Sequence, residues 1–235
     1  MIKWVDNWIH DWVQAHSNLY GGVIMGVQSA AGEHETTNAR EFTKQEIIAA
    51  NVEAILQAMG LDLTDPSIER TPQRVADFLM EFINEHDYEE ILGGGFRAEQ
   101  SDGASVHSMV VQSNIPFRML CEHHLLPALG NAAIGYVPED RVIGLSKLTR
   151  LVDAVGTERP GLQEAITDRI ADLLNGHLRP KGTMVVISAE HSCMACRGVN
   201  VPNVITTTSA VRGVFRDVPQ ARAEFFELIR QTKGR

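Results

Sequence analysis

Two short clusters of sulfur and imidazole side chains are the most chemically informative feature of this sequence. The first is Cys121-Glu122-His123-His124, and the second is His191-Ser192-Cys193-Met194-Ala195-Cys196. A thiolate and an imidazole three residues apart can reach one zinc ion, and both are common zinc ligands in proteins. Because the two clusters hold all three cysteines of the chain, they predict one metal site built from both.

The number of ligands decides what such a metal can do. If all three cysteines and His124 bind, four ligands complete a tetrahedron, and the metal only stabilises the fold. If Cys196 is left out, the fourth position stays open, and the metal can convert a bound water to hydroxide near neutral pH. Spacing alone leaves both arrangements open.

Further polar side chains beside the ligands favour the open arrangement. His123 and His191 belong to the residue type that titrates near neutral pH, which suits proton transfer, and a structural metal site has no need of them. Glu122 is a candidate for orienting a ligand through a hydrogen bond. The clusters therefore predict metal-assisted hydrolysis with histidines as proton-transfer groups.

The predicted elements place both clusters at strand ends. Short apolar runs predict antiparallel strands at residues 109–111, 117–120, 132–137, 183–189 and 204–209. Helical periodicity predicts helices at residues 43–59, 71–83, 146–155, 160–178 and 219–231, the first starting at a capping box. Helices, then strands, then helices and strands again indicate an α+β fold.

Residues 1–42 differ from the rest and are expected to form an N-terminal extension. Its three tryptophans recur at helical spacing, and residues 29–40 are polar enough for a linker. A short helix docked on the core or on a neighbouring subunit is the simplest interpretation. Residues 43–235 are expected to be the catalytic domain, with a helical part at 43–100 and a core at 101–235.

Composition and charge argue against several classes of protein. The 235 residues are 44% hydrophobic and 22% charged, which is typical of soluble globular domains. A net charge of −9 argues against nucleic-acid binding, so an anionic small molecule would need a local basic pocket. An odd cysteine count, no signal-peptide pattern and no apolar run of about 18 residues argue against secretion and membrane insertion. We expect a cytoplasmic protein.

From residue 43 to about residue 232 the sequence resembles the GTP cyclohydrolase I family. The similar stretches include both metal clusters and follow the family's order. The others are Thr71-Pro72-Gln73-Arg74-Val75, Val142-Ile143-Gly144-Leu145-Ser146-Lys147, Arg159-Pro160, Gln163-Glu164, Arg197-Gly198 and Thr206-Thr207-Thr208-Ser209.

This resemblance implies a tunnelling fold. In that fold an antiparallel sheet with helices on one side joins the sheets of neighbouring subunits into an oligomeric barrel. The usual assembly is a decamer of two pentamers with active sites at subunit interfaces. The resemblance also implies the open metal arrangement, in which Cys121, His124 and Cys193 hold Zn²⁺ and His123 and His191 transfer protons.

Substrate-binding residues follow from the same resemblance. Glu164, helped by Gln163, would bind the guanine edge. Five basic or hydroxyl side chains would hold the triphosphate: Ser146, Lys147, Arg150, Arg197 and Arg74. Asp77 follows the Arg74 stretch, and because an acid repels a triphosphate at short range, we expect it to point away or to face a cation.

The activity implied by the resemblance is hydrolysis of GTP by water at guanine C8. Formate is released, and the remainder rearranges to 7,8-dihydroneopterin triphosphate, the first step of folate and pterin biosynthesis. Two alternatives stay open. One is a related enzyme that stops at a formylated, ring-opened intermediate, and the other is a non-catalytic structural zinc or nucleotide-binding protein.

Overall fold

The structure, a computed structural model, describes residues 42–98 and 107–233, so the tryptophan-rich segment lies outside the described residues. The chain divides into two units, and the boundary in the sequence lies between Met80 and Glu81. The first contains α2 (Lys44–Ala58) and α3 (Thr71–Met80). The expected capping box starts α2, since the Thr43 side chain accepts from the backbone N–H of Glu46. Asp77 on α3 accepts hydrogen bonds from Gln45 and Gln73 within this unit.

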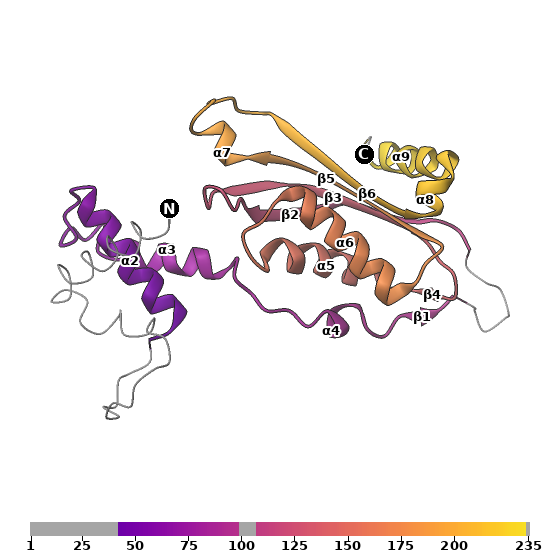
Figure 1. The fold of residues 1–235 in the computed structure, drawn as a ribbon, viewed down its shortest axis with the longest axis horizontal. Helices are drawn as coiled ribbons and strands as arrows, with labels where there is room; N and C mark the ends of the chain where they lie inside the picture. Colours follow the sequence, from indigo (N-terminus) through magenta and orange to yellow (C-terminus); the bar gives the residue numbers. More distant parts are fainter. Residues whose placement is uncertain (1–41, 99–106, 234–235) are drawn as a thin grey trace, which may run out of the picture. The chain divides into compact units, whose positions relative to one another are not determined.

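The second unit is built on a four-stranded antiparallel sheet in the order β2-β3-β5-β6 (Figure 1). Its strands are β2 (Val110–Leu120), β3 (Pro127–Val137), β5 (Gly182–His191) and β6 (Ile205–Gly213). Its two long central helices are α5 (Leu145–Thr157) and α6 (Gln163–Leu178). The smaller elements and the last helix are α4 (Tyr88–Leu92), β1 (Phe96–Arg97), β4 (Arg141–Val142), α7 (Ser192–Ala195), α8 (Val214–Asp217) and α9 (Pro219–Lys233). The expected α+β class is confirmed.

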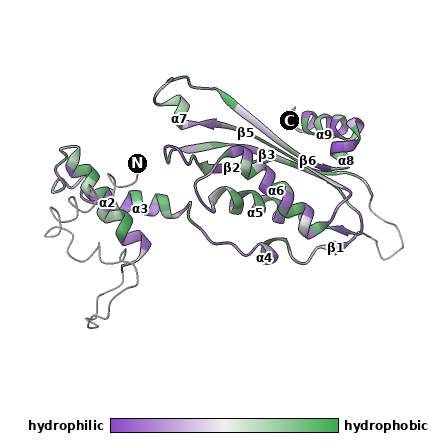
Figure 2. Ribbon diagram, in the orientation of Figure 1, coloured by the Kyte–Doolittle hydropathy of each residue, from purple (hydrophilic) through white to green (hydrophobic). Residues whose placement is uncertain are grey.

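Helices α5 and α6 cover one face of the sheet and form the main core with it. Their apolar residues recur every three or four positions, so each helix turns one stripe toward the strands. Figure 2 shows hydrophobic and hydrophilic residues alternating along both helices. The fully buried side chains of this core include Ile134, Leu148, Leu151, Ile170, Leu174 and Val185. This packing fixes the two helices against the strands that carry the metal clusters.

The opposite face of the sheet is also partly covered, by α8 and α9 (Figure 1). Phe215 and Phe225 are fully buried there and meet edge to face, with ring centroids 6.1 Å apart. The expectation of helices on one side was therefore incomplete. Periodicity predicts the helix at the C-terminus, but it does not say which face of the sheet that helix covers.

Strand β2 corrects a second expectation, because the apolar runs 109–111 and 117–120 belong to one strand. Its pairing with β3 shifts register between Gln112 and Ile115, and Asn114 has a left-handed backbone with φ 57°. A bulge of this kind interrupts the alternation of apolar and polar residues without ending the strand. The polar segment between the runs is therefore a bulge and not a turn.

Two glycines provide a test of the packing, with opposite expected effects. A Cβ on Gly130 would lie 2.0 Å from the carbonyl oxygen of Ser188 on the neighbouring strand, whereas one on Gly176 in α6 meets nothing within 4 Å. Gly130→Ala should destabilise the protein by about 2 kcal/mol or more, because β3 and β5 must separate. Gly176→Ala should stabilise it by about 1 kcal/mol through helix propensity. Thermal unfolding midpoints that move in the same direction would contradict this packing.

In the described residues, no helix is both long and apolar enough to cross a membrane.

Candidate metal centre and active site

Strand register brings the two metal clusters to the same end of the sheet. Leu120 at the end of β2 pairs with Pro127 at the start of β3, and Ala128 pairs with His191 at the end of β5. Cys121 directly follows β2, and Cys193 lies on α7 directly after β5. Clusters about 70 residues apart in the sequence are therefore neighbours in the fold, as their positions at strand ends predicted.

A tight turn and a backbone bridge hold the first cluster in place. The Leu125 N–H donates to the Cys121 carbonyl at 2.9 Å, and the Cys121 N–H donates to the Leu126 carbonyl at 2.9 Å. Gly161, just before α6, donates to Leu120 at 3.0 Å and accepts from Glu122 at 3.2 Å. These bonds place the start of α6, with Gln163 and Glu164, beside the cysteine.

Cys121, His124 and Cys193 form a group that could hold a metal ion. One sulfur or nitrogen atom from each lies within 4.8 Å of the other two, and Cys121 is buried while His124 is exposed. Within the part of the chain that the structure describes, this is the one such group of His, Cys, Asp and Glu side chains. Two sulfurs and one imidazole are a donor set that suits zinc.

Cys196 does not belong to this group. It is the exposed residue that ends α7, and its N–H donates to the Ser192 carbonyl at 2.9 Å. The three-ligand arrangement is therefore the one that the side chains form, and the geometry lends no support to a closed site with four ligands.

Arg197 contacts the Nε2 atom of His124. A guanidinium can only donate, so this contact requires a lone pair on Nε2 and places the proton of the neutral ring on Nδ1. The Nδ1 atom is the one that faces the Cys121 sulfur, at 4.0 Å.

Gln163 is buried, and the hydrogen-bond partners of its side chain fix its orientation. Its Nε2 atom lies 3.1 Å from each of the carbonyl oxygens of Ile187 and Thr206 and from the Thr208 hydroxyl, and these atoms share its two N–H donors. Carbonyls accept and never donate, so the amide nitrogen must face them, and the amide oxygen faces His191 at 2.8 Å. Nε2 of His191 is then the donor to Gln163, and Nδ1 of the neutral ring is left as the proton acceptor.

Two further candidate residues at this end are exposed, the proton-transfer candidate His123 and the guanine-binding candidate Glu164. His123 lies beside Cys121, with Nδ1 at 3.7 Å from the sulfur, and its Nε2 is 4.0 Å from a Glu122 carboxylate oxygen. Glu164 lies in the first turn of α6, with its carboxylate in solvent next to the buried Gln163. Both side chains are free to contact a ligand near the metal group.

Three candidate triphosphate residues, Ser146, Lys147 and Arg150, lie far from the metal group in the same chain. Helix α5 runs parallel to β2, because Thr149 near its start bonds to Gln112 while Gly156 near its end packs against Arg118. Strand β2 spans about 25 Å or more between Gln112 and Cys121 at roughly 3.3 Å per residue. Lys147 donates to the carbonyls of Ile91 and Gly93, far from Cys121. Arg74 is exposed on α3 in the other unit.

Comparison with known proteins gives the affiliation of the chain. The sequence model of the family described as GTP cyclohydrolase I matches residues 48–230. The chain belongs to the GTP cyclohydrolase I family. It is 40% identical to GTP cyclohydrolase 1 of Hydrogenobaculum sp., covering 80% of this chain and 98% of that protein. It is 42% identical to GTP cyclohydrolase 1 of Bacillus subtilis, covering 82% and 98%.

A further relative and one solved structure complete the comparison. GTP cyclohydrolase 1 of Halalkalibacterium halodurans is 43% identical, covering 79% of this chain and 96% of that protein. A crystal structure of the archaeosine synthase QueF-Like in the apo form aligns with a TM-score of 0.38 and 15% identity, covering 45% of this chain and 94% of that chain. At that TM-score the likeness carries no argument. The chain is thus identified by sequence as an enzyme of the GTP cyclohydrolase I family.

Two features of this member of the GTP cyclohydrolase I family were not evident from its sequence. One is the Gly161 backbone bridge, which joins the metal turn to α6. The other is the cradle of Ile187, Thr206 and Thr208 around Gln163. The threonine run was recognisable as a motif, but its contact with a side chain about 43 residues earlier depends on the pairing of β5 with β6.

Metal binding by this family member should weaken in acid. Burial, followed by the neighbouring Cys121 sulfur, raises the pKa of the Cys193 thiol. This thiol is therefore protonated at neutral pH, and a metal must displace that proton, so its affinity rises with pH. We expect zinc affinity to fall about tenfold or more per unit between about pH 8 and about pH 6. Competition with a chromophoric chelator measures it, and a pH-independent affinity would contradict the expectation.

Proposed function

We propose that this protein hydrolyses GTP at guanine C8 with a bound Zn²⁺ ion. Formate and 7,8-dihydroneopterin triphosphate are the products, which balances GTP plus one water and forms the first step of folate and pterin biosynthesis. The proposal rests on the group formed by Cys121, His124 and Cys193, to which Cys196 does not belong. The chain that carries this group is a member of the GTP cyclohydrolase I family. Three protein ligands leave a coordination position for a reacting group, as in catalytic zinc sites.

Zinc bound to these three ligands would supply Lewis-acid activation of water at neutral pH. The protein supplies the proton transfers. With its Nε2–H held by Gln163, His191 exchanges a proton through Nδ1, which suits protonation of guanine N7 and makes C8 more electrophilic. His123, exposed beside Cys121, is the second proton-transfer group.

Substrate recognition is assigned to Glu164, Gln163 and the basic residues. The Glu164 carboxylate can accept hydrogen bonds from the donor edge of guanine, as its place beside the metal turn suggests. Gln163 contributes indirectly, because its amide is occupied by backbone and by His191. Arg197, whose guanidinium contacts His124, is a basic residue beside the metal group and is suited to hold a phosphate there.

The distance between the metal group and Lys147 supports an active site shared between subunits. The start of α5 lies beside Gln112, about 25 Å along β2 from Cys121, which is longer than a nucleoside triphosphate. Ser146, Lys147 and Arg150 of one chain would therefore serve the metal group of another. Arg74 would contribute in the same assembly. We propose the tunnelling-fold barrel, a decamer of two pentamers with interfacial sites, and a cytoplasmic location.

The test is incubation of the zinc-loaded protein with GTP. Formate, measured with formate dehydrogenase, and a pterin fluorophore after oxidation should appear in equal amounts. A ring-opened formylated product without formate would instead indicate the related enzyme that stops early. No GTP consumption by a fully metal-loaded protein would indicate a structural zinc protein.

A further inference from the structure

Two arginines face each other across the small sheet formed by β1 and β4. Arg97 on β1 is the direct partner of Arg141 on β4, and both side chains are exposed. Like charges directly opposite each other in a sheet are destabilising, and strands of two residues offer few other contacts to offset the repulsion. Locally unfavourable arrangements of this kind are expected where a residue serves function and not folding.

A third arginine, Arg179, lies near this pair at the end of α6. Arg179 is exposed and has a left-handed backbone with φ 48°. Among residues 42–98 and 107–233, neither Arg97 nor Arg179 has a hydrogen bond or ion pair to an acid, and Arg141 donates only to the Gly95 carbonyl at 3.2 Å. We call Arg97, Arg141 and Arg179 the arginine cluster.

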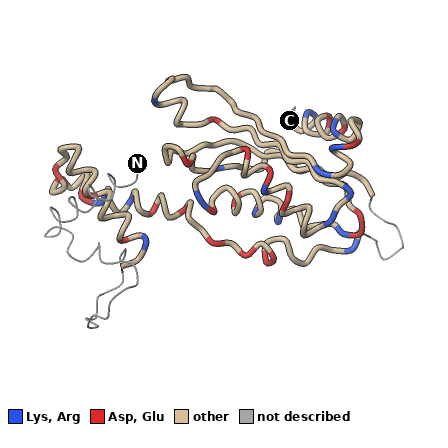
Figure 3. The backbone as a smooth tube through the Cα atoms, viewed as in Figure 1, with Lys and Arg blue, Asp and Glu red and all other residues tan. Residues whose placement is uncertain are grey.

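The acids around the arginine cluster are mostly committed elsewhere. Both Asp168 and Asp172 accept from Arg212, at 2.8 Å and 2.7 Å. Glu89 faces His177 at 3.1 Å, and Glu139 faces Lys181 at 3.9 Å. Among the acids that the structure describes along the cavities at the cluster, Asp140 is the one without an ion pair, so one such carboxylate lies beside three guanidinium groups. Figure 3 shows basic residues gathered at this end of the unit.

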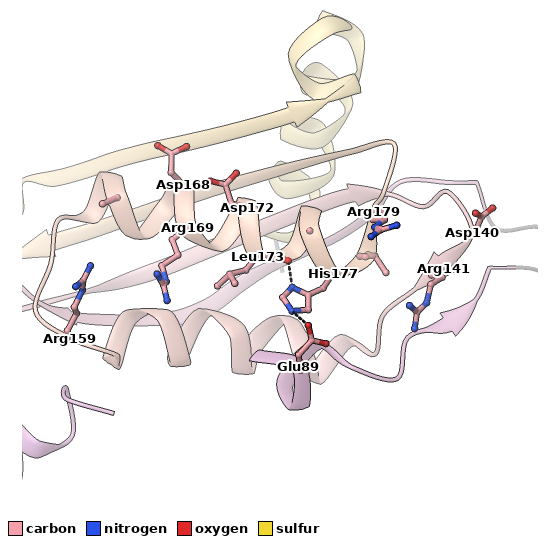
Figure 4. A pocket seen from close by; sticks show the side chains of 13 residues that line it. Glu89, Asp140, Arg141, Arg159, Asp168, Arg169, Asp172, Leu173, His177 and Arg179 are labelled. Atoms are coloured by element: carbon pink, nitrogen blue, oxygen red, sulfur yellow. Dashed lines mark hydrogen bonds and ion pairs between the residues drawn. The ribbon is translucent and has the colours of Figure 1, made fainter. Parts of the chain in front are cut away.

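Two adjoining cavities open onto the arginine cluster. A groove of about 1120 Å³ is lined by Arg141 and Arg179, and a cavity of about 620 Å³ by Arg97 and Arg141. Arg141 and Asp140 line both. Figure 4 shows Arg141, Arg179 and Asp140 at one end of the groove, with Arg159 at the other. There is therefore room for a ligand between the guanidinium groups.

The arginine cluster is separate from the metal group. Arg141 follows the end of β3 at Val137, whereas Cys121 and His191 lie at the other end of that strand, next to Pro127 and Ala128. Strand β3 has 11 residues, which corresponds to about 30 Å or more. A ligand at the cluster would not touch the metal group of the same chain.

We propose that the arginine cluster binds a phosphate-bearing anion at a site distinct from the metal centre. Guanidinium groups present forked N–H donors that match phosphate oxygens. Three of them close together repel one another and together attract an anion that carries two or more charges. The bound anion would neutralise the repulsion between Arg97 and Arg141. The proposal is independent of the reaction proposed above.

Inorganic pyrophosphate is the probe, with binding measured by calorimetry on the full chain. Arg97→Gln and Arg141→Gln should each weaken binding at least tenfold, and the matched control Arg230→Gln, an exposed arginine on α9, should not. Without pyrophosphate, Arg97→Gln should unfold at the same or a higher temperature than the parent, because a repulsion is removed. Pyrophosphate should raise the unfolding temperature of the parent but not of this variant.

Three results would overturn the proposal. One is pyrophosphate affinity that is equal in the parent and in Arg97→Gln. Another is binding that is lost in Lys147→Gln and kept in the two cluster variants, which would assign the anion to the substrate's triphosphate site. The third is a changed oligomeric state in the cluster variants without any pyrophosphate binding, which would make the cluster a contact for an acidic surface of a second copy.

Discussion

Cys193→Ser is expected to abolish zinc binding and, with it, the conversion of GTP. A serine hydroxyl does not ionise near neutral pH, so one of the two sulfur ligands would be replaced by a weak neutral oxygen. Loss of a group that merely orients a ligand costs roughly 10- to 100-fold in metal affinity, so loss of the ligand itself should exceed about 100-fold. Zinc content by mass spectrometry and formate release should fall together.

Cys196→Ser is the matched control, because the two cysteines lie one helical turn apart at the same short helix. Cys196 is exposed and lies outside the metal group, so this variant should keep both its zinc and its activity. Zinc lost from the control would make Cys196 a fourth ligand and would rule out an open coordination position. Zinc kept in Cys193→Ser would remove Cys193 from the set of ligands. Cys121→Ser should behave as Cys193→Ser does.

The sequence contained enough information for the fold class and the metal group, for physical reasons that can be stated. Strand ends are marked by the change from apolar runs to polar residues, and every cysteine followed such a change. Antiparallel pairing then made neighbours of Cys121 and Cys193. Spacing alone did not choose between three and four ligands, because Cys193 and Cys196 both lie at the same strand end. The neighbouring histidines and the family resemblance favoured three, and the structure groups Cys121, His124 and Cys193 without Cys196.

Other features depend on tertiary packing that no local pattern encodes. The bulge at Asn114 looks like a turn in sequence, since a polar break in an apolar pattern is common to both. The position of α9 on the second face depends on how Phe225 meets Phe215. The family resemblance implied that Gln163 helps Glu164 to bind guanine, and it could not show that the Gln163 side chain is buried against backbone carbonyls.

Gln163→Leu is the second variant with a large expected effect, on both stability and catalysis. Leucine has a similar volume but no donors, so the buried carbonyl of Ile187 and the part-buried carbonyl of Thr206 would lose this partner, while the Thr208 hydroxyl keeps its contact with Thr167. Each buried group left unsatisfied costs about 1–3 kcal/mol, so we expect a loss of about 2 kcal/mol or more in unfolding free energy. Denaturant titration of the zinc-loaded protein measures it.

The same variant should change His191 in a way that instability alone would not. Without the Gln163 oxygen, the Nε2–H of His191 has no acceptor there, and the neutral ring is no longer held with Nδ1 free. Nitrogen chemical shifts of selectively labelled His191 should report a mixed tautomer, and kcat should fall by more than about tenfold with a smaller change in KM. Glu164→Gln, one residue away and exposed, should leave stability and the tautomer unchanged while raising KM. If Gln163→Leu keeps the parent's tautomer and kcat, the buried amide serves folding only, and His191 must be oriented by something other than this contact.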